Sequence, residues 1–71
     1  MKMKKTLAER LRDLREDHDL TQKQLAVLLK KDRSSYTYYE TGKTEPCVND
    51  LILLADFYHV SLGYLTGRSD R

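Results

Sequence analysis

The sequence predicts an all-α domain of five short helices, and three observations lead to that prediction. Apolar residues recur at helical spacing, as they do at Leu7, Leu11 and Leu14. Threonine, aspartate or serine stands before most of the apolar segments, in the manner of helix N-caps. No stretch alternates apolar and polar residues over four or more positions between turn signals, so no β-strand is expected. A chain of 71 residues has room for one small domain.

Two capping boxes mark the starts of the first two helices. Residues 6–9 (Thr-Leu-Ala-Glu) and residues 21–24 (Thr-Gln-Lys-Gln) each place a threonine three positions before a glutamate or glutamine. In this pattern the threonine hydroxyl accepts a backbone hydrogen bond, and the longer side chain reaches back to the backbone of the threonine. We expect the first helix to run from residue 6 or 7 to about Asp17, and the second to end near Lys30.

Three further helices are expected in the second half of the chain. Asp32 can cap a third helix that runs to about Glu40, where Gly42 is free to take the positive φ that ends it. The fourth helix is expected over residues 48–58 and the fifth over residues 62–66. The chain then divides into a basic N-terminal arm (residues 1–5), a helical domain (residues 6–67) and a polar tail (residues 68–71).

Composition excludes several classes of protein. The longest apolar run, residues 51–55, is far shorter than the roughly 18 residues of a membrane span. The basic N-terminus is not followed by the apolar stretch of a secretory signal. Cys47 is the only cysteine, which excludes an internal disulfide and a cysteine-based zinc site. We therefore expect a cytoplasmic protein with no membrane segment, no metal and no cofactor.

Positive charge is concentrated in the middle of the chain. The formal net charge is only +2, but residues 21–43 hold five lysines and arginines against two acidic residues. Residues 9–19, by contrast, hold three basic and five acidic residues. A polyanion would therefore bind the central segment, although the same pattern also occurs on ordinary solvated helices.

One segment resembles a nucleotide-binding loop but lacks its context. Residues 37–44 end in Gly-Lys-Thr, yet Thr37 stands where a phosphate-binding loop requires glycine. The segment also closes a helix, whereas such a loop follows a strand and opens a helix. A bundle this small holds no credible Ser/His/Asp, Cys/His or paired-carboxylate set, so we do not expect an enzyme.

The spacing of the second and third helices indicates a DNA-binding helix-turn-helix, because a turn of about three residues joins them. Residues 20–26, residues 33–46 and residues 54–62 carry a more specific pattern: Leu-Thr-Gln-Lys-Gln-Leu-Ala, then Arg-Ser-Ser-Tyr through to the proline, then Leu-Ala-Asp-Phe-Tyr-His-Val-Ser-Leu. Together they resemble the Cro/phage-repressor-type helix-turn-helix family, also called XRE-like. The resemblance covers about residues 6–67. It implies a lambda-repressor-like fold of five helices, whose third helix enters the DNA major groove as part of a dimer.

The third helix has one face suited to reading DNA bases. At 100° per residue, Ser34, Thr37, Tyr38 and Thr41 fall on one side, with Arg33 beside them at the helix start. An arginine can bind guanine O6 and N7 together, and hydroxyl groups can meet base edges. The alternatives are phosphate contact for the arginine and plain surface positions for the others. The expected base-reading residues are Arg33, Ser34, Thr37 and Tyr38, and the inward face holds Tyr36, Tyr39 and Glu40.

The resemblance also implies residues that position the domain on DNA. In this family a glutamine at the start of the second helix binds a phosphate, which implies that role for Gln22, and the helix dipole also favours an anion there. Arg15 and Glu40 match the family's paired arginine and glutamate, which implies an ion pair between the first helix and the end of the third. The expected phosphate contacts are Thr21, Gln22, Lys43 and Thr44.

Four positions depart from the family pattern. Lys30 stands where glycine is frequent, and Lys31 stands where an apolar turn residue is usual. Tyr36 replaces an aliphatic residue, and Cys47 replaces a serine or threonine cap. We expect a basic and less well packed turn, a larger group at position 36 that fills part of that space, and a weakly capped fourth helix.

The fold and the resemblance together indicate a sequence-specific regulator of transcription. We expect a repressor that binds a palindromic double-stranded DNA operator as a homodimer, with recognition helices about 34 Å apart. The alternative is an antitoxin-like or adaptor protein that uses the same fold to bind another protein, and it would be indifferent to the loss of Arg33. The residues expected at the dimer interface are Val60, Leu62, Tyr64 and Leu65.

Overall fold

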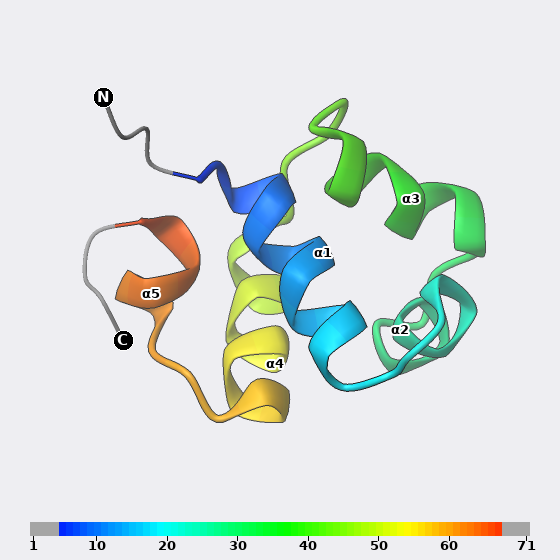
Figure 1. The fold of residues 1–71 in the computed structure, drawn as a ribbon. Helices are drawn as coiled ribbons and strands as arrows, with labels where there is room; N and C mark the ends of the chain where they lie inside the picture. The colour runs from blue at the N-terminus through cyan, green and yellow to red at the C-terminus, as the bar shows by residue number, and fades with distance from the viewer. Residues whose placement is uncertain (1–4, 68–71) are drawn as a thin grey trace.

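The computed structural model describes residues 5–67, and within this range the chain forms five helices and no strand. The predicted all-α architecture is therefore confirmed. Residues 1–4 of the expected basic arm and the whole expected polar tail lie outside the described residues. The helices, shown in Figure 1, are α1 (Leu7–Asp17), α2 (Gln22–Leu28), α3 (Arg33–Thr41), α4 (Val48–Tyr58) and α5 (Leu62–Thr66).

Both predicted capping boxes are formed. The Thr6 hydroxyl accepts the Glu9 backbone N–H at 3.1 Å, and the Glu9 carboxylate accepts the Thr6 N–H at 2.8 Å. Thr21 and Gln24 make the same two contacts at 3.1 and 2.7 Å. These contacts satisfy backbone donors that would otherwise have no partner in the first turn. Cys47, as expected, begins α4 without a side-chain cap.

The end of α2 differs from the prediction. The helix ends at Leu28, two residues before Lys30, which has a left-handed backbone with φ of +59°. The Lys30 N–H donates to the Val27 carbonyl at 3.0 Å, and the Lys31 N–H donates to the Ala26 carbonyl at 2.8 Å. This is the Schellman arrangement that usually places glycine in the left-handed position. Because Lys30 rather than glycine takes this position, the sequence carries no glycine that would mark the end of α2.

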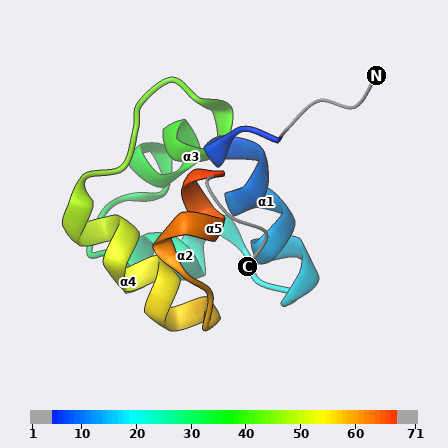
Figure 2. The ribbon, with the colours of Figure 1, turned by 90° about the vertical axis from the view of Figure 1, so that its left-hand side faces the viewer.

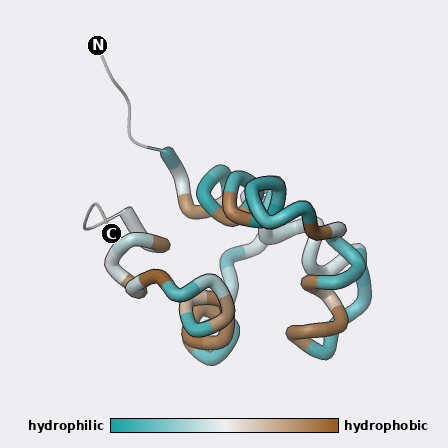
Figure 3. The backbone as a smooth tube through the Cα atoms, turned by 60° about the horizontal axis from the view of Figure 1, so that its bottom comes forward, coloured by the Kyte–Doolittle hydropathy of each residue, from teal (hydrophilic) through white to brown (hydrophobic). Residues whose placement is uncertain are grey.

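The core is built from the inward faces of all five helices. α1 lies at the centre of Figure 1, with α2 and α3 to one side and α5 to the other, and Figure 2 shows α5 beside both α1 and α4. Apolar positions are prominent along α4 when the backbone is coloured by hydropathy (Figure 3). No helix within residues 5–67 is long and apolar enough to cross a membrane. The most deeply buried large side chains are Leu11, Leu25, Tyr36, Leu54 and Leu65.

Candidate nucleic-acid interface

α3 has one solvent-facing side and one buried side, as the sequence predicted. Ser34, Tyr38 and Thr41 are exposed, and Thr37 is half-buried on the same side. Tyr36 and Tyr39 lie in the core on the opposite side. The exposed side is polar and lies along a helix at the surface, which is the geometry that a major-groove reader requires.

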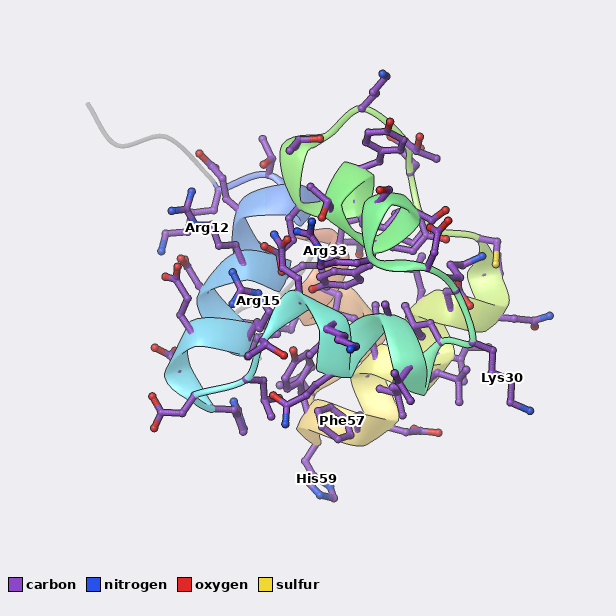
Figure 4. The ribbon with its side chains drawn as sticks, turned by 90° about the vertical axis from the view of Figure 1, so that its right-hand side faces the viewer. Arg12, Arg15, Lys30, Arg33, Phe57 and His59 are labelled. Atoms are coloured by element: carbon purple, nitrogen blue, oxygen red, sulfur yellow. The ribbon has the colours of Figure 1, made fainter. Side chains whose placement is uncertain are left out.

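Arg33 begins α3 and is exposed. It forms no hydrogen bond or ion pair with any residue in the range 5–67. Figure 4 looks onto α2 and α3 and labels Arg33 together with Arg15 of α1. The five N–H donors of the Arg33 guanidinium are therefore available to an external acceptor.

Gln22 links the first residue of α2 to the exposed side of α3. Its Oε1 accepts the Thr37 hydroxyl at 2.8 Å, and its Nε2 donates to Glu40 Oε1 at 3.2 Å. The second amide N–H of Gln22 has no acceptor among residues 5–67 and can donate to an external one. The Thr37 hydroxyl donates its single proton to Gln22. Its oxygen can therefore only accept a hydrogen bond from a base.

Glu40 joins three helices through its carboxylate. Arg15 of α1 donates from Nε to Oε2 at 2.7 Å and from Nη2 to Oε1 at 3.1 Å. Tyr36 donates its hydroxyl to Oε2 at 2.6 Å, and the Gln22 amide of α2 completes the set. These four hydrogen bonds match the four lone-pair positions of a carboxylate. The side chain of Glu40 is only 3% exposed, so its charge depends on these donors.

The pKa of Glu40 reflects competition between burial and hydrogen bonding. Burial alone would raise the pKa, because it disfavours the charged form. The hydrogen bonds from Arg15, Tyr36 and Gln22 outweigh burial and hold the pKa of Glu40 below its ordinary value. The hydrogen bond to Glu40 is also the main reason that the pKa of Arg15 is raised. Both groups of the ion pair are therefore charged at neutral pH.

The family of this chain follows from its match to a sequence model. Residues 11–65, more than three quarters of the chain, match the model described as helix-turn-helix. The chain belongs to the helix-turn-helix family. The XRE-like resemblance predicted from the sequence is thereby confirmed.

Curated relatives of this helix-turn-helix chain come from Bacillus subtilis (strain 168). The uncharacterized HTH-type transcriptional regulator YobD is 42% identical over 62 residues, which is 87% of this chain and 55% of the relative. The HTH-type transcriptional regulator ImmR is 31% identical over 65 residues, which is 92% of this chain and 51% of the relative. The chain thus spans about half the length of the curated relatives that it matches.

Solved structures show the same helix-turn-helix fold. A transcriptional regulator from Listeria innocua is 33% identical, with a TM-score of 0.87 over 97% of this chain and 64% of that one. The P22 c2 repressor in complex with a synthetic operator is 23% identical, with a TM-score of 0.82 over 92% of this chain and 98% of that one. The second comparison shows the fold alone. The lambda-repressor-like architecture predicted from the sequence is therefore confirmed.

The predicted phosphate-binding residues lie at two places around the helix-turn-helix. Thr21 and Gln22 stand at the N-terminus of α2, and Lys43 and Thr44 follow α3. The Lys43 ammonium lies 4.6 Å from the centroid of the Tyr38 ring. Thr21, Lys43 and Thr44 are exposed. Their role as phosphate contacts stays a prediction.

A second polar cluster on the helix-turn-helix was missed by sequence reasoning. Asp50 of α4 is buried, accepts the Tyr39 hydroxyl at 2.7 Å and lies 3.4 Å from the Lys31 ammonium. Lys31 therefore fits its turn by pairing with a buried carboxylate rather than by apolar packing. The charge of Asp50 is the main reason that the pKa of Lys31 is raised. The sequence shows both Lys31, at a usually apolar position, and Asp50, in the first turn of α4. No local pattern in the sequence indicates that the two residues form a pair.

The predicted dimer residues do not all reach the surface of the helix-turn-helix domain. Leu65 is fully buried in the core, so its assignment to a dimer interface is wrong. Leu62 is exposed, and Val60 and Tyr64 are partly buried. The Tyr64 ring also packs under the Arg10 guanidinium, whose carbon lies 4.9 Å from the ring centroid. A dimer role for Val60, Leu62 and Tyr64 stays a prediction.

Proposed function

We propose that this chain is a sequence-specific double-stranded DNA-binding regulator of transcription that inserts α3 into the major groove. One observation carries the proposal. The buried side of α3 is fixed to α1 through Glu40 and Arg15, while the exposed side begins with the unpaired guanidinium of Arg33. A helix held in this way can place donors and acceptors against base edges with a fixed register.

The exposed side of α3 favours particular bases. Arg33 can donate to O6 and N7 of guanine together, the commonest specific arginine contact. Thr37 can accept only from an exocyclic amine, on adenine or cytosine, or place its methyl group against the methyl of thymine. Guanine shows only acceptors in the major groove, so it is a poor partner for the Thr37 hydroxyl. Ser34 can donate or accept and discriminates less.

Two sites beside α3 are suited to the DNA backbone. The free N–H of Gln22 lies at the N-terminus of α2, where the helix dipole favours an anion. Lys43 and Thr44 lie beyond the other end of α3. Backbone contacts at both ends would fix the register of α3 along the groove without reading sequence themselves.

The regulator is proposed to act as a homodimer and a repressor on a palindromic operator. The match to transcriptional regulators supports the regulatory role, and the solved P22 c2 repressor on its operator shows that this fold can occupy an operator. The exposed Leu62, with Val60 and Tyr64 beside it, is the proposed surface for a second copy. Half-sites one helical turn apart follow from such a dimer.

The test is a selection of bound sequences from a random duplex pool, with wild-type protein and Arg33→Ala. A single palindromic motif is expected for wild type. Arg33→Ala is expected to cost about 1–3 kcal/mol of binding and to relax one base position in each half-site. Lys23→Ala, which removes an exposed positive charge from α2, is the matched control and should keep the motif.

Two outcomes would contradict the proposal. Binding without any selected motif, lost steeply as salt rises, would leave only the nonspecific phosphate interaction. Equal motifs for wild type and Arg33→Ala would show that Arg33 does not read a base, contrary to its assigned role in the proposal. The first result would favour the adaptor or antitoxin-like function, in which the partner is a protein.

A further inference from the structure

The C-terminal end of α3 contains a lysine that rests on an aromatic ring. Tyr38 lies on the exposed side of α3, and the residue is 39% exposed. The Lys43 ammonium lies 4.6 Å from the centroid of that ring, within the range of a cation–π contact. Lys43 lies two residues beyond the last residue of α3, so the loop must turn back for this contact to form.

The backbone explains why the loop turns back. Gly42 has a left-handed conformation with φ of +83°, which ends the helix and reverses the chain. The Tyr38 carbonyl then accepts the Thr44 N–H and the Thr41 hydroxyl, both at 3.3 Å. The hydrogen-bonded turn therefore brings the backbone of Lys43 back towards α3, within reach of the Tyr38 ring for the Lys43 side chain.

The environment of Lys43 differs from that of two other lysines. Lys5 is paired with Asp13, and Lys31 is paired with Asp50, so a carboxylate offsets the charge of each. Lys43 forms no ion pair with any carboxylate of residues 5–67. An aromatic face attracts a cation without neutralising it, so Lys43 is positioned while it keeps its full charge.

We propose that Tyr38 is a positioning residue whose ring holds the Lys43 ammonium for a DNA backbone phosphate beside the groove that α3 occupies. This role rests on the proposed function. It assigns the contribution of Tyr38 to its ring rather than to its hydroxyl. A lysine that is already held loses less side-chain freedom when it binds, so the ring increases affinity without contacting the phosphate.

The first test needs no DNA and uses NMR of the free protein. A proton above an aromatic ring is shifted upfield, so the ε-methylene protons of Lys43 are expected upfield of those of Lys30, an exposed lysine with no aromatic contact among the described residues. Tyr38→Phe should keep the shift and Tyr38→Leu should abolish it. An unchanged Lys43 resonance in Tyr38→Leu would overturn the proposal.

The second test measures affinity for the selected duplex as a function of salt. Lys43→Gln is expected to lower the slope of log affinity against log salt by about 0.9 per protomer, the value for one lost phosphate contact. Tyr38→Leu should weaken binding roughly 2- to 5-fold, and Tyr38→Phe should restore most of that loss. In the Lys43→Gln background, Tyr38→Leu should have little further effect. Thermal unfolding of each variant checks that the domain remains folded.

The outcomes separate this role from the proposed function. Equal losses in Tyr38→Phe and Tyr38→Leu would assign the effect to the hydroxyl and overturn the positioning role. Independent, multiplying effects of Tyr38→Leu and Lys43→Gln would also overturn it, because the two residues would not act as a pair. Lys30→Gln controls for the general loss of one positive charge. Wild-type protein that binds no duplex would instead contradict the proposed function itself.

Discussion

Arg15 and Glu40 form a bidentate ion pair across 25 positions of sequence, with the two contacts at 2.7 and 3.1 Å. The pair fixes the C-terminal part of α3 to α1. A third contact, from Arg15 Nη1 to the Leu20 carbonyl at 2.9 Å, extends the same guanidinium to the segment before α2. One arginine therefore sets the position of both helices of the helix-turn-helix relative to α1.

Loss of Arg15 is expected to destabilise the domain strongly. Arg15→Ala leaves the carboxylate of Glu40 buried without its charged partner, and breaking such a pair costs about 3–5 kcal/mol. Urea unfolding followed by circular dichroism measures the change. The matched control is Arg12→Ala, because Arg12 forms an exposed pair with Glu16 and should cost less than about 1 kcal/mol. Equal costs for the two variants would contradict the structural role of Arg15.

Acid is expected to destabilise the domain through Glu40. Its pKa in the folded state lies below the ordinary value of 4.5, so its stabilising contribution is complete above pH 4.5. The contribution is lost as the pH falls from 4.5 through the lower folded-state pKa. Urea midpoints measured from pH 6 to pH 3 should therefore fall less steeply for Glu40→Gln than for wild type. Parallel curves would show that Glu40 does not account for this acid sensitivity.

Replacing Lys30 with glycine is expected to stabilise the domain. Lys30 has a φ of +59°, and a left-handed backbone costs a residue with a Cβ roughly 1–2 kcal/mol. The greater freedom of glycine in the unfolded chain offsets part of that gain, so a net increase of about 0.5–1 kcal/mol is expected. Thermal unfolding measures it. Lys23→Gly, inside α2, is the control and should destabilise by about 1 kcal/mol.

Two buried tyrosines are expected to respond differently to the loss of a hydroxyl group. Tyr39 donates to the buried Asp50, so Tyr39→Phe removes a hydrogen bond to a charged group and should cost about 1.5–3 kcal/mol. The Tyr58 hydroxyl is buried with no hydrogen-bond partner among the described residues, and burial raises its pKa to about 12. Tyr58→Phe should therefore be neutral or stabilising. Chemical denaturation measures the free energy of unfolding of both variants. A large loss of stability in Tyr58→Phe would contradict the prediction that its hydroxyl has no hydrogen-bond partner.

Thr37 provides a test of base preference on the proposed DNA site. Thr37→Val keeps the shape but removes the hydroxyl, so preference for adenine or cytosine opposite this position should fall while a thymine contact survives. Thr37→Ser keeps the hydrogen bond to Gln22 and removes the methyl group. In this variant the preference for thymine should fall, while the preference for adenine or cytosine survives. Selection from a random duplex pool with each variant measures the preference. Identical motifs for both variants would show that Thr37 does not contact a base.

Local patterns in the sequence predicted most of the fold. The capping residues Thr6, Thr21 and Asp32 act within three positions of their partners, so each helix start is encoded in a few adjacent residues. The end of α2 was placed too late, because Lys30 takes a backbone conformation that glycine or asparagine usually signals. The end of a helix cannot be predicted from residue types when a residue other than glycine or asparagine takes the left-handed conformation there.

The site was predicted only where periodicity or family resemblance applied. The two sides of α3 follow from helical spacing, and the pair of Arg15 and Glu40 followed from the resemblance. The pairing of Lys31 with Asp50 spans 19 positions and depends on how α4 packs, so no local signal indicates it. Leu65 was misplaced because a five-residue helix has too few turns to show which side faces inward.

α3 is anchored from two directions, to α1 through Glu40 and to α4 through Tyr39 and Asp50. A helix held at both places cannot change its tilt without breaking a buried polar contact. In the proposed complex, the DNA rather than α3 would therefore change its conformation on binding. Base pairs that no side chain touches would then influence affinity through their stiffness, and flexible pyrimidine–purine steps between the half-sites would be favoured over rigid ones.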